Sequence, residues 1–193
     1  MVERGVLART LGPGHFPHQL SWLIDNPLRR LVIRPETLAD RLPLTESAEV
    51  LEVGPGSGYF SVELARRLPR GHLELLDLQR EMLVKARSKL DAAGHRNVGY
   101  TAHDVARPLP YEDEAFDVVV MVAVLGEVSD PEACLTNVRT VLRPGGTLAV
   151  HEHVPDPDRI PISVLRPLVE RSGYIFQRLM GPRWSYTAIF ERM

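Results

Sequence analysis

The sequence has little cysteine and no long apolar run. Its one cysteine, Cys134, cannot form a disulfide within the chain, which is typical of proteins from reducing compartments. No apolar segment approaches the roughly 20 residues that cross a bilayer, and residues 1–10 lack the apolar centre of a signal peptide. We therefore expect a cytoplasmic protein without membrane contact, in which Cys134 is a buried residue of a helix.

Lysine is also scarce. Only Lys85 and Lys89 occur among 23 basic residues, and the net charge is -2. The arginines are dispersed, so the charge distribution does not predict a nucleic-acid partner. A chain of 193 residues, 44% of them hydrophobic, suffices for one well-packed α/β domain.

The character of the chain changes near residue 44. Residues 1–43 combine a glycine- and proline-rich start with two helical segments, 19–32 and 35–41, and we interpret them as an N-terminal helical extension or lid. Residues 44–193 are expected to form a single compact domain. In this part, short apolar strands alternate with amphipathic helices, which is typical of a parallel sheet covered by helices.

Seven strands are predicted, at residues 49–53, 72–76, 98–102, 116–124, 147–151, 175–180 and 185–191. Helices are predicted at residues 59–68, 79–93, 131–142 and 161–173, and a turn at Gly145-Gly146. The turn at Gly181-Pro182 is too short for a parallel crossover, so the last two strands must be antiparallel. We therefore predict an α/β fold of the Rossmann-like, doubly wound kind, with a mostly parallel seven-stranded sheet and an antiparallel C-terminal hairpin.

A glycine-rich run, Glu52-Val53-Gly54-Pro55-Gly56-Ser57-Gly58, follows the first strand and precedes a helix. Such a loop brings backbone N–H groups to a helix N-terminus, where nucleotide-like ligands are favoured. The nicotinamide dinucleotide pattern G-x-G-x-x-G needs a third glycine at position 59, but this position is Tyr59. A purely structural tight turn is the alternative.

Two carboxylates follow the next two strands. Asp77 can accept two hydrogen bonds from a ribose diol, although it could instead cap the following helix. Asp104 can accept a hydrogen bond from the exocyclic amine of an adenine, with a surface turn as the alternative. Together with the glycine run, these residues predict a nucleoside ligand.

The motifs resemble those of class I S-adenosylmethionine (SAM)-dependent methyltransferases, most closely the ubiquinone/menaquinone-biosynthesis type. The resemblance spans residues 48–152 and includes Val50–Phe60, Leu76–Leu83, His103-Asp104-Val105, Phe116–Val120 and Leu142–Leu148. It implies SAM as the cofactor and a small-molecule methyl acceptor. The cofactor-binding residues that it implies are Glu52, Gly54, Pro55, Gly56, Ser57, Gly58, Asp77, Leu78, Met82, Asp104, Val105, Met121 and Val122.

The chain departs from this family after the fourth strand. Many relatives carry a polar or acidic residue there, whereas this chain continues with the apolar residues Met121 to Leu125. Any polar contact to the methionine end of the cofactor must then come from the backbone or from elsewhere. Besides an active methyltransferase, a SAM-binding protein without transfer activity therefore stays open, as does a nicotinamide-dependent oxidoreductase.

The candidate catalytic residues are His151, Glu152 and His153, at the end of the fifth strand. Strand alternation directs the two histidines to one face and Glu152 to the other. We predict that they bind the acceptor or act as a general base, with solvated loop residues as the alternative. Two histidines two positions apart without a third ligand are weak grounds for a metal site, so no metal is expected.

The N-terminal extension supplies a second group of candidates, namely His15, Phe16, His18 and Trp22. These residues could close over the acceptor, or could be the packed face of an amphipathic helix. The apolar segment Trp22-Leu23-Ile24 could also touch a membrane surface if the acceptor is a lipid. The oligomeric state cannot be derived from the sequence.

Overall fold

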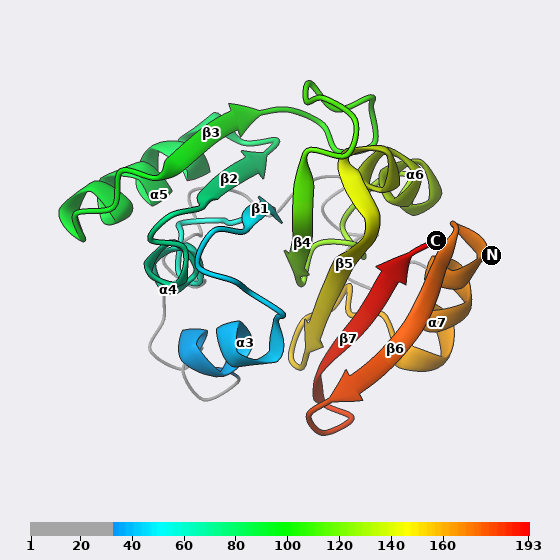
Figure 1. Cartoon of the computed structure of the whole chain (residues 1–193). Coiled ribbons are helices and arrows are strands. Elements are labelled where there is room, and N and C mark those ends of the chain that lie inside the picture. The colour runs from blue at the N-terminus through cyan, green and yellow to red at the C-terminus, as the bar shows by residue number, and fades with distance from the viewer. Residues whose placement is uncertain (1–32) are drawn as a thin grey trace.

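The computed structural model describes residues 33–193 (Figure 1). The predicted helix at 19–32, the lid candidates between residues 15 and 22 and the patch at 22–24 lie outside the described residues. The division of the chain at residue 43 stays a prediction. Helix α3 (Pro35–Arg41) has the predicted bounds, and its Leu38 and Ala39 are buried in the same hydrophobic cluster as Leu64 and Leu83 of the main domain.

Seven strands form one sheet in the order β3-β2-β1-β4-β5-β7-β6. β1 to β5 pair in parallel, and β7 pairs antiparallel with both β5 and β6. The predicted fold class is therefore confirmed. The strands are β1 (Glu49–Val53), β2 (His72–Asp77), β3 (Val98–Ala102), β4 (Phe116–Val122), β5 (Leu142–His153), β6 (Tyr174–Met180) and β7 (Ser185–Arg192).

Helices cover both faces of the sheet, because the inner strands are apolar on both sides. α3, α4 and α5 pack in one hydrophobic cluster, and α6 and α7 pack in the other. Figure 1 shows α4 and α5 beside β2 and β3, and α6 and α7 beside the C-terminal half of the sheet. The further helices are α4 (Ser61–Arg67), α5 (Arg80–Ala92), α6 (Pro131–Val141) and α7 (Ile162–Arg171).

β4 and β5 are the strands whose bounds differ from the prediction by more than one residue. β4 ends at Val122, because Ala123 takes a φ of 55° and so leaves the extended conformation. β5 begins at Leu142 instead of residue 147, and Gly145-Gly146 lies inside this strand rather than in a separate turn. The pairing with β4 shifts register there, and Gly145 absorbs the irregularity with a φ of 73°.

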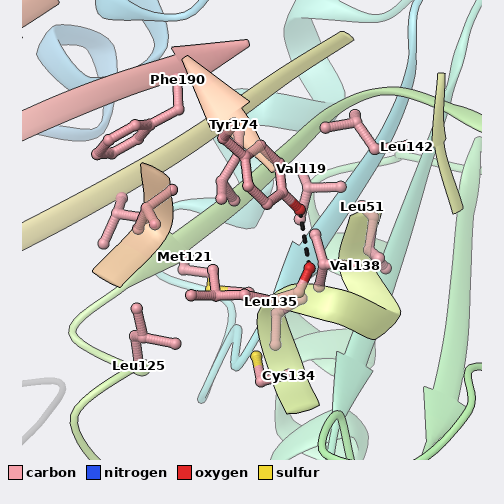
Figure 2. Close-up of a cluster of buried hydrophobic side chains, with 14 of the residues drawn as sticks. Leu51, Val119, Met121, Leu125, Cys134, Leu135, Val138, Leu142, Tyr174 and Phe190 are labelled. Carbon is pink, nitrogen blue, oxygen red and sulfur yellow. Dashed lines mark hydrogen bonds between the residues drawn. The ribbon is translucent and has the colours of Figure 1, made fainter. Parts of the chain in front are cut away.

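The core between the sheet and helices α6 and α7 contains one buried polar contact (Figure 2). The Tyr174 hydroxyl donates a hydrogen bond of 3.0 Å to the carbonyl oxygen of Leu135. Cys134 is fully buried in α6, as predicted, and burial raises the pKa of its thiol to about 12. Its thiol therefore stays protonated and acts as a small apolar side chain.

Candidate active site

The direction of the strand order changes between β1 and β4. From β1 the chain adds β2 and β3 on one side, and then β4 and β5 on the other. At such a switch point, the loops beyond the strand C-termini diverge and leave a crevice. A cavity of about 220 Å³ lies at this point and is lined by residues that follow β1, β2, β3 and β4.

The loop after β1 forms one wall of the cavity and depends on glycine. Gly54 has a φ of 66°, and a Cβ atom built there would lie 2.4 Å from Val124 Cγ2. Its N–H donates to the carbonyl oxygen of Leu76 at 2.8 Å, which fixes the loop to β2. Gly58 has a φ of 80°, and an added Cβ would lie 3.0 Å from the backbone of Ala86 in α5. Gly54 thus lets the loop pack against Val124 of the loop after β4, and Gly58 lets α5 pack against the loop.

Asp77 is the last residue of β2 and lines the cavity. Its Oδ1 accepts a hydrogen bond of 2.8 Å from the backbone N–H of Gln79, the N-cap residue of α5. Asp77 therefore binds the residue before the helix, and α5 has no side-chain cap. A carboxylate has two oxygens and several lone pairs, so this contact is compatible with ligand binding.

Asp104 lines the cavity one strand further along the sheet. Its Oδ1 accepts a hydrogen bond of 2.9 Å from the Ala106 N–H, which shapes a local turn. The neighbouring Val105 is buried, and its carbonyl oxygen accepts from Asn137 Nδ2 of α6 at 3.1 Å. This contact holds the loop after β3 against the body of the domain.

Apolar side chains complete the cavity. Leu78 and Met82 line it from the start of α5, and Val105 and Val128 from the loops after β3 and β4. Leu78 is 44% exposed although it is a large apolar residue. An exposed leucine beside two carboxylates suits a ligand with a flat apolar ring and a polar diol.

The structure brings most of the predicted cofactor-binding residues to this cavity. Those that line it are Gly54, Pro55, Gly56, Asp77, Leu78, Met82, Asp104, Val105 and Val122. The predicted residues absent from the lining are Glu52, Ser57, Gly58 and Met121. Glu52 is buried and accepts a hydrogen bond of 2.6 Å from Ser61 Oγ, while Met121 lies in the core near Leu135 (Figure 2). The cofactor roles of all these residues stay predictions.

Sequence reasoning missed the rim that the loop after β4 contributes. Ala123, Val124, Glu127 and Ser129 line the cavity, as does His103 after β3. Their position directly after a buried strand was the available signal, because ligands collect beyond strand C-termini. The loop after β5 supports this rim, since a Cβ at Gly126 would lie 2.0 Å from the carbonyl oxygen of Asp158.

The three candidate catalytic residues belong to β5. None of them is among the residues that line the cavity in the described part of the chain. Their exposed fractions are 0% for His151, 1% for Glu152 and 8% for His153, so they are not solvated loop residues. The histidine rings stack at 5.7 Å on one face of the sheet, as alternation predicts. His151 also pairs with Val122 of the cavity wall, and Ala123 N–H donates to the carbonyl oxygen of His151 at 2.8 Å.

Glu152 points to the opposite face, under the segment that leads to α7. Its Oε2 accepts a hydrogen bond of 3.1 Å from the backbone N–H of Ile160, and its Oε1 is buried without a hydrogen-bond partner. Burial, with smaller contributions from the carboxylates of Asp156 and Glu127, raises the pKa of Glu152 to about 8. The Ile160 N–H and Arg159 act in the opposite direction. Glu152 is therefore mostly protonated at neutral pH.

Two further features concern ligands and membranes. Within residues 33–193, no group of three or more histidine, cysteine or acidic side chains is arranged to hold a metal ion. None of the helices in this described part is both long and apolar enough to span a bilayer.

A family model described as "Methyltransferase domain" matches residues 50–146, which include the glycine loop, Asp77 and Asp104. The chain belongs to the class I SAM-dependent methyltransferases. Members of this family use SAM as the methyl donor, so the cavity can be compared with the needs of that cofactor.

Named relatives support this membership. The chain is 33% identical over 160 residues to the ubiquinone/menaquinone biosynthesis C-methyltransferase UbiE of Roseobacter denitrificans, covering 81% of this chain and 63% of that protein. It is 30% identical over 144 residues to a phosphatidylethanolamine N-methyltransferase of Cereibacter sphaeroides, covering 75% and 66%. The methyltransferase chain thus spans less than two thirds of the length of either relative.

Solved structures share the fold. A SAM-dependent methyltransferase from Aquifex aeolicus superimposes with a TM-score of 0.84 at 22% identity, covering 92% of this chain and 98% of that one. The [4+2]-cyclase SpnF superimposes with a TM-score of 0.71 at 18% identity, covering 84% and 80%. Because a protein named as a cyclase shares the fold, the fold of this methyltransferase chain does not by itself fix the reaction.

Proposed function

We propose that this chain transfers the methyl group of SAM to a small-molecule acceptor. The observation that carries the proposal is the composition of the cavity at the β1–β4 switch point. It combines a glycine loop that approaches the ligand closely, two carboxylates on neighbouring strands and an apolar wall. A nucleoside with a charged tail needs all three.

The residues present fit SAM. Asp77 would accept hydrogen bonds from the ribose hydroxyls, and Asp104 would accept one from the adenine amine. Leu78 and Met82 would cover the adenine ring. The loop at Gly54 and Gly56 would bring backbone N–H groups to the methionine end, where Val122, Ala123 and Val124 directly after β4 supply no polar side chain. When bound, SAM supplies an electrophilic methyl group on a sulfonium.

The protein's share of the reaction is then alignment and exclusion of water. Alignment of two reactants can account for roughly 7–11 kcal/mol of barrier reduction, so no dedicated base is required unless the acceptor must lose a proton. His151 and His153 lie on the same sheet face as Val122, because β5 continues the row of the cavity wall. We propose these two histidines as the acceptor side of the site. Glu152 faces away from it.

Calorimetry with SAM, S-adenosylhomocysteine (SAH) and NAD(P) tests the cofactor. SAM and SAH should bind, and a preference for NAD(P) would contradict the proposal. Asp77→Asn keeps the Oδ1 contact to Gln79 but removes the charge, and a charge-assisted hydrogen bond is worth about 1.5–3 kcal/mol, so SAH affinity should fall roughly 10- to 100-fold. The control is Asp91→Asn, whose carboxylate pairs with Arg96 on the exposed side of α5 and should leave SAH affinity unchanged.

A SAM-binding protein without transfer activity is the second candidate. The apolar residues directly after β4 favour it, because Val122, Ala123 and Val124 offer no side chain that could bind or deprotonate an acceptor, and the polar Glu127 and Ser129 come only later in the loop. Transfer of a labelled methyl group to an extract of small molecules separates the two. SAH binding with no labelled product in any fraction would favour the second candidate.

A further inference from the structure

A row of side chains crosses the sheet from the cavity toward the C-terminal hairpin. Val122 of β4 pairs with His151 of β5, and His151 pairs with Thr187 of β7. Ala149 and Ile189, two positions along the strand from His151 and Thr187, lie in the same hydrophobic cluster as Val122. Because residues two apart in a strand share a face, the side chains of Val122, His151 and Thr187 all point to the face covered by α3. The row therefore continues the cavity wall sideways under α3.

Polar contacts join the outer part of this row. His151 Nδ1 lies 3.0 Å from Thr187 Oγ1, and the same oxygen accepts a hydrogen bond of 3.0 Å from Arg41 Nη1 at the end of α3. Thr187 and His151 are fully buried, whereas Arg41 is half-buried. The hydroxyl thus connects an accessible guanidinium to a buried imidazole beside the cavity wall.

Within residues 33–193, Arg41 has no acidic partner. Its neighbour Asp40 pairs with Arg67 at 2.6 Å, and the pKa of Arg41 is lowered by burial alone, without a carboxylate to oppose this effect. Arg178 adds a second positive charge, since its Nη2 donates to the carbonyl oxygen of Arg41 at 3.3 Å. A half-buried guanidinium without a counter-charge favours a carboxylate or phosphate, which it can bind with two parallel hydrogen bonds.

The Arg41 guanidinium packs against the C-terminal hairpin. It lies against Gly181 of the hairpin turn, where an added Cβ would lie 3.1 Å from both Nη1 and Nη2. No residue of α3, β5 or β7 lines the cofactor cavity, so the row begins where the cavity ends. A group bound at Arg41 would thus belong to the second substrate and not to SAM.

We infer that Arg41, supported by Thr187 and His151, binds an anionic group of the methyl acceptor, a carboxylate or a phosphate. Thr187 is two strands away from Val122, and strands lie about 4.8 Å apart, so roughly 10 Å separates the Thr187 end of the row from Val122 of the cavity wall. This inference rests on the proposed function and narrows its substrate to small molecules with a remote negative charge.

Site-resolved chemical modification tests the inference on the full chain. Phenylglyoxal reacts with accessible arginines, and peptide mass spectrometry gives the rate for each. With SAH present, inorganic phosphate and acetate are added in separate arms, which distinguishes a phosphate from a carboxylate site. If the Kd is on the order of 1 mM, about 10 mM of the anion should slow modification of Arg41 about tenfold. The control is Arg70, which is exposed and pairs with Glu46 at 2.6 Å, and its rate should not change.

Variants separate this inference from the proposed function. Arg41→Gln should bind SAH like the wild type, and should lose the change that phosphate or acetate causes in the NMR signals of the His151 ring. Arg41→Lys keeps the charge without the planar fork, and should retain only part of that change. Equal modification rates of wild-type Arg41 with and without both anions would overturn the inference, whether or not the variants fold. Loss of SAH binding in a folded Arg41→Gln would also overturn it, because the row would then serve the cofactor.

Discussion

Replacing Glu152 with glutamine should remove a large pH dependence of stability. The carboxyl is buried, has one hydrogen bond from the Ile160 N–H and has a pKa of about 8. Glutamine resembles the protonated acid, because it offers one acceptor to Ile160 and one donor toward the site of the unpartnered Oε1. Glu152→Gln should therefore fold like the wild type at low pH and differ from it as the pH rises.

The direction and size follow from proton linkage. Between the ordinary value of 4.5 and the folded value of about 8, the unfolded chain has released the proton of Glu152 and the folded chain retains it. The stability that this group provides is thus fully present below pH 4.5, and falls until the pH reaches the folded pKa. At 1.36 kcal/mol per pH unit the loss is on the order of 5 kcal/mol. It is smaller if the segment at 154–161 opens locally, since the loss then stops at the free energy of that opening.

Urea unfolding of wild type and Glu152→Gln, followed by circular dichroism at half-unit steps from pH 5 to pH 9, measures this term. The difference in unfolding free energy should be small at pH 5 and should grow in favour of the variant up to pH 8, with equal m-values. All other titrating groups are common to both chains and cancel in the difference. Parallel profiles across the whole range would refute the reasoning, because Glu152 would then have an ordinary pKa.

Two further substitutions test the glycine loop and the core. Gly54→Ala should abolish SAH binding, because the new Cβ meets Val124 at 2.4 Å, whereas Gly94→Ala has a similar φ of 82° in open space and should cost only about 1–2 kcal/mol of stability with SAH binding retained. Tyr174→Phe removes the hydrogen bond to Leu135 and should lower the urea unfolding free energy by about 1 kcal/mol, while unchanged stability would show that this bond contributes nothing.

The fold could be predicted because its signals are local. Short apolar strands, the glycine run after β1 and the short turn at Gly181-Pro182 each restrict the chain within a few residues. The ends of β4 and β5 could not be predicted in the same way. Ala123 adopts a positive φ without being glycine, and Gly145 bends a strand that pairs on both sides of it. Both conformations depend on neighbouring strands and not on local sequence.

The cofactor side of the candidate site was more predictable than the acceptor side. Asp77 and Asp104 follow strands whose C-termini meet at one edge of a parallel sheet, so the strand pattern alone brings them together. His151 and His153 also lie at the C-terminal end of a parallel strand, but the strand pattern does not predict that they are buried. β7 pairs with β5 as far as His153 and brings Thr187 beside His151, and strand pairing of that range has no local signature.

The position of β7 also determines what the acceptor side can bind. Had the hairpin been added with β6 next to β5, Thr187 would stand one strand further from His151, and Arg41 could not reach both through one hydroxyl. The observed order places β7 between β5 and β6. Thr187 therefore contacts both Arg41, 146 positions away in the chain, and His151, 36 positions away. The antiparallel hairpin therefore supplies the hydroxyl that joins α3 to β5, which is the contact on which the proposed anion site depends.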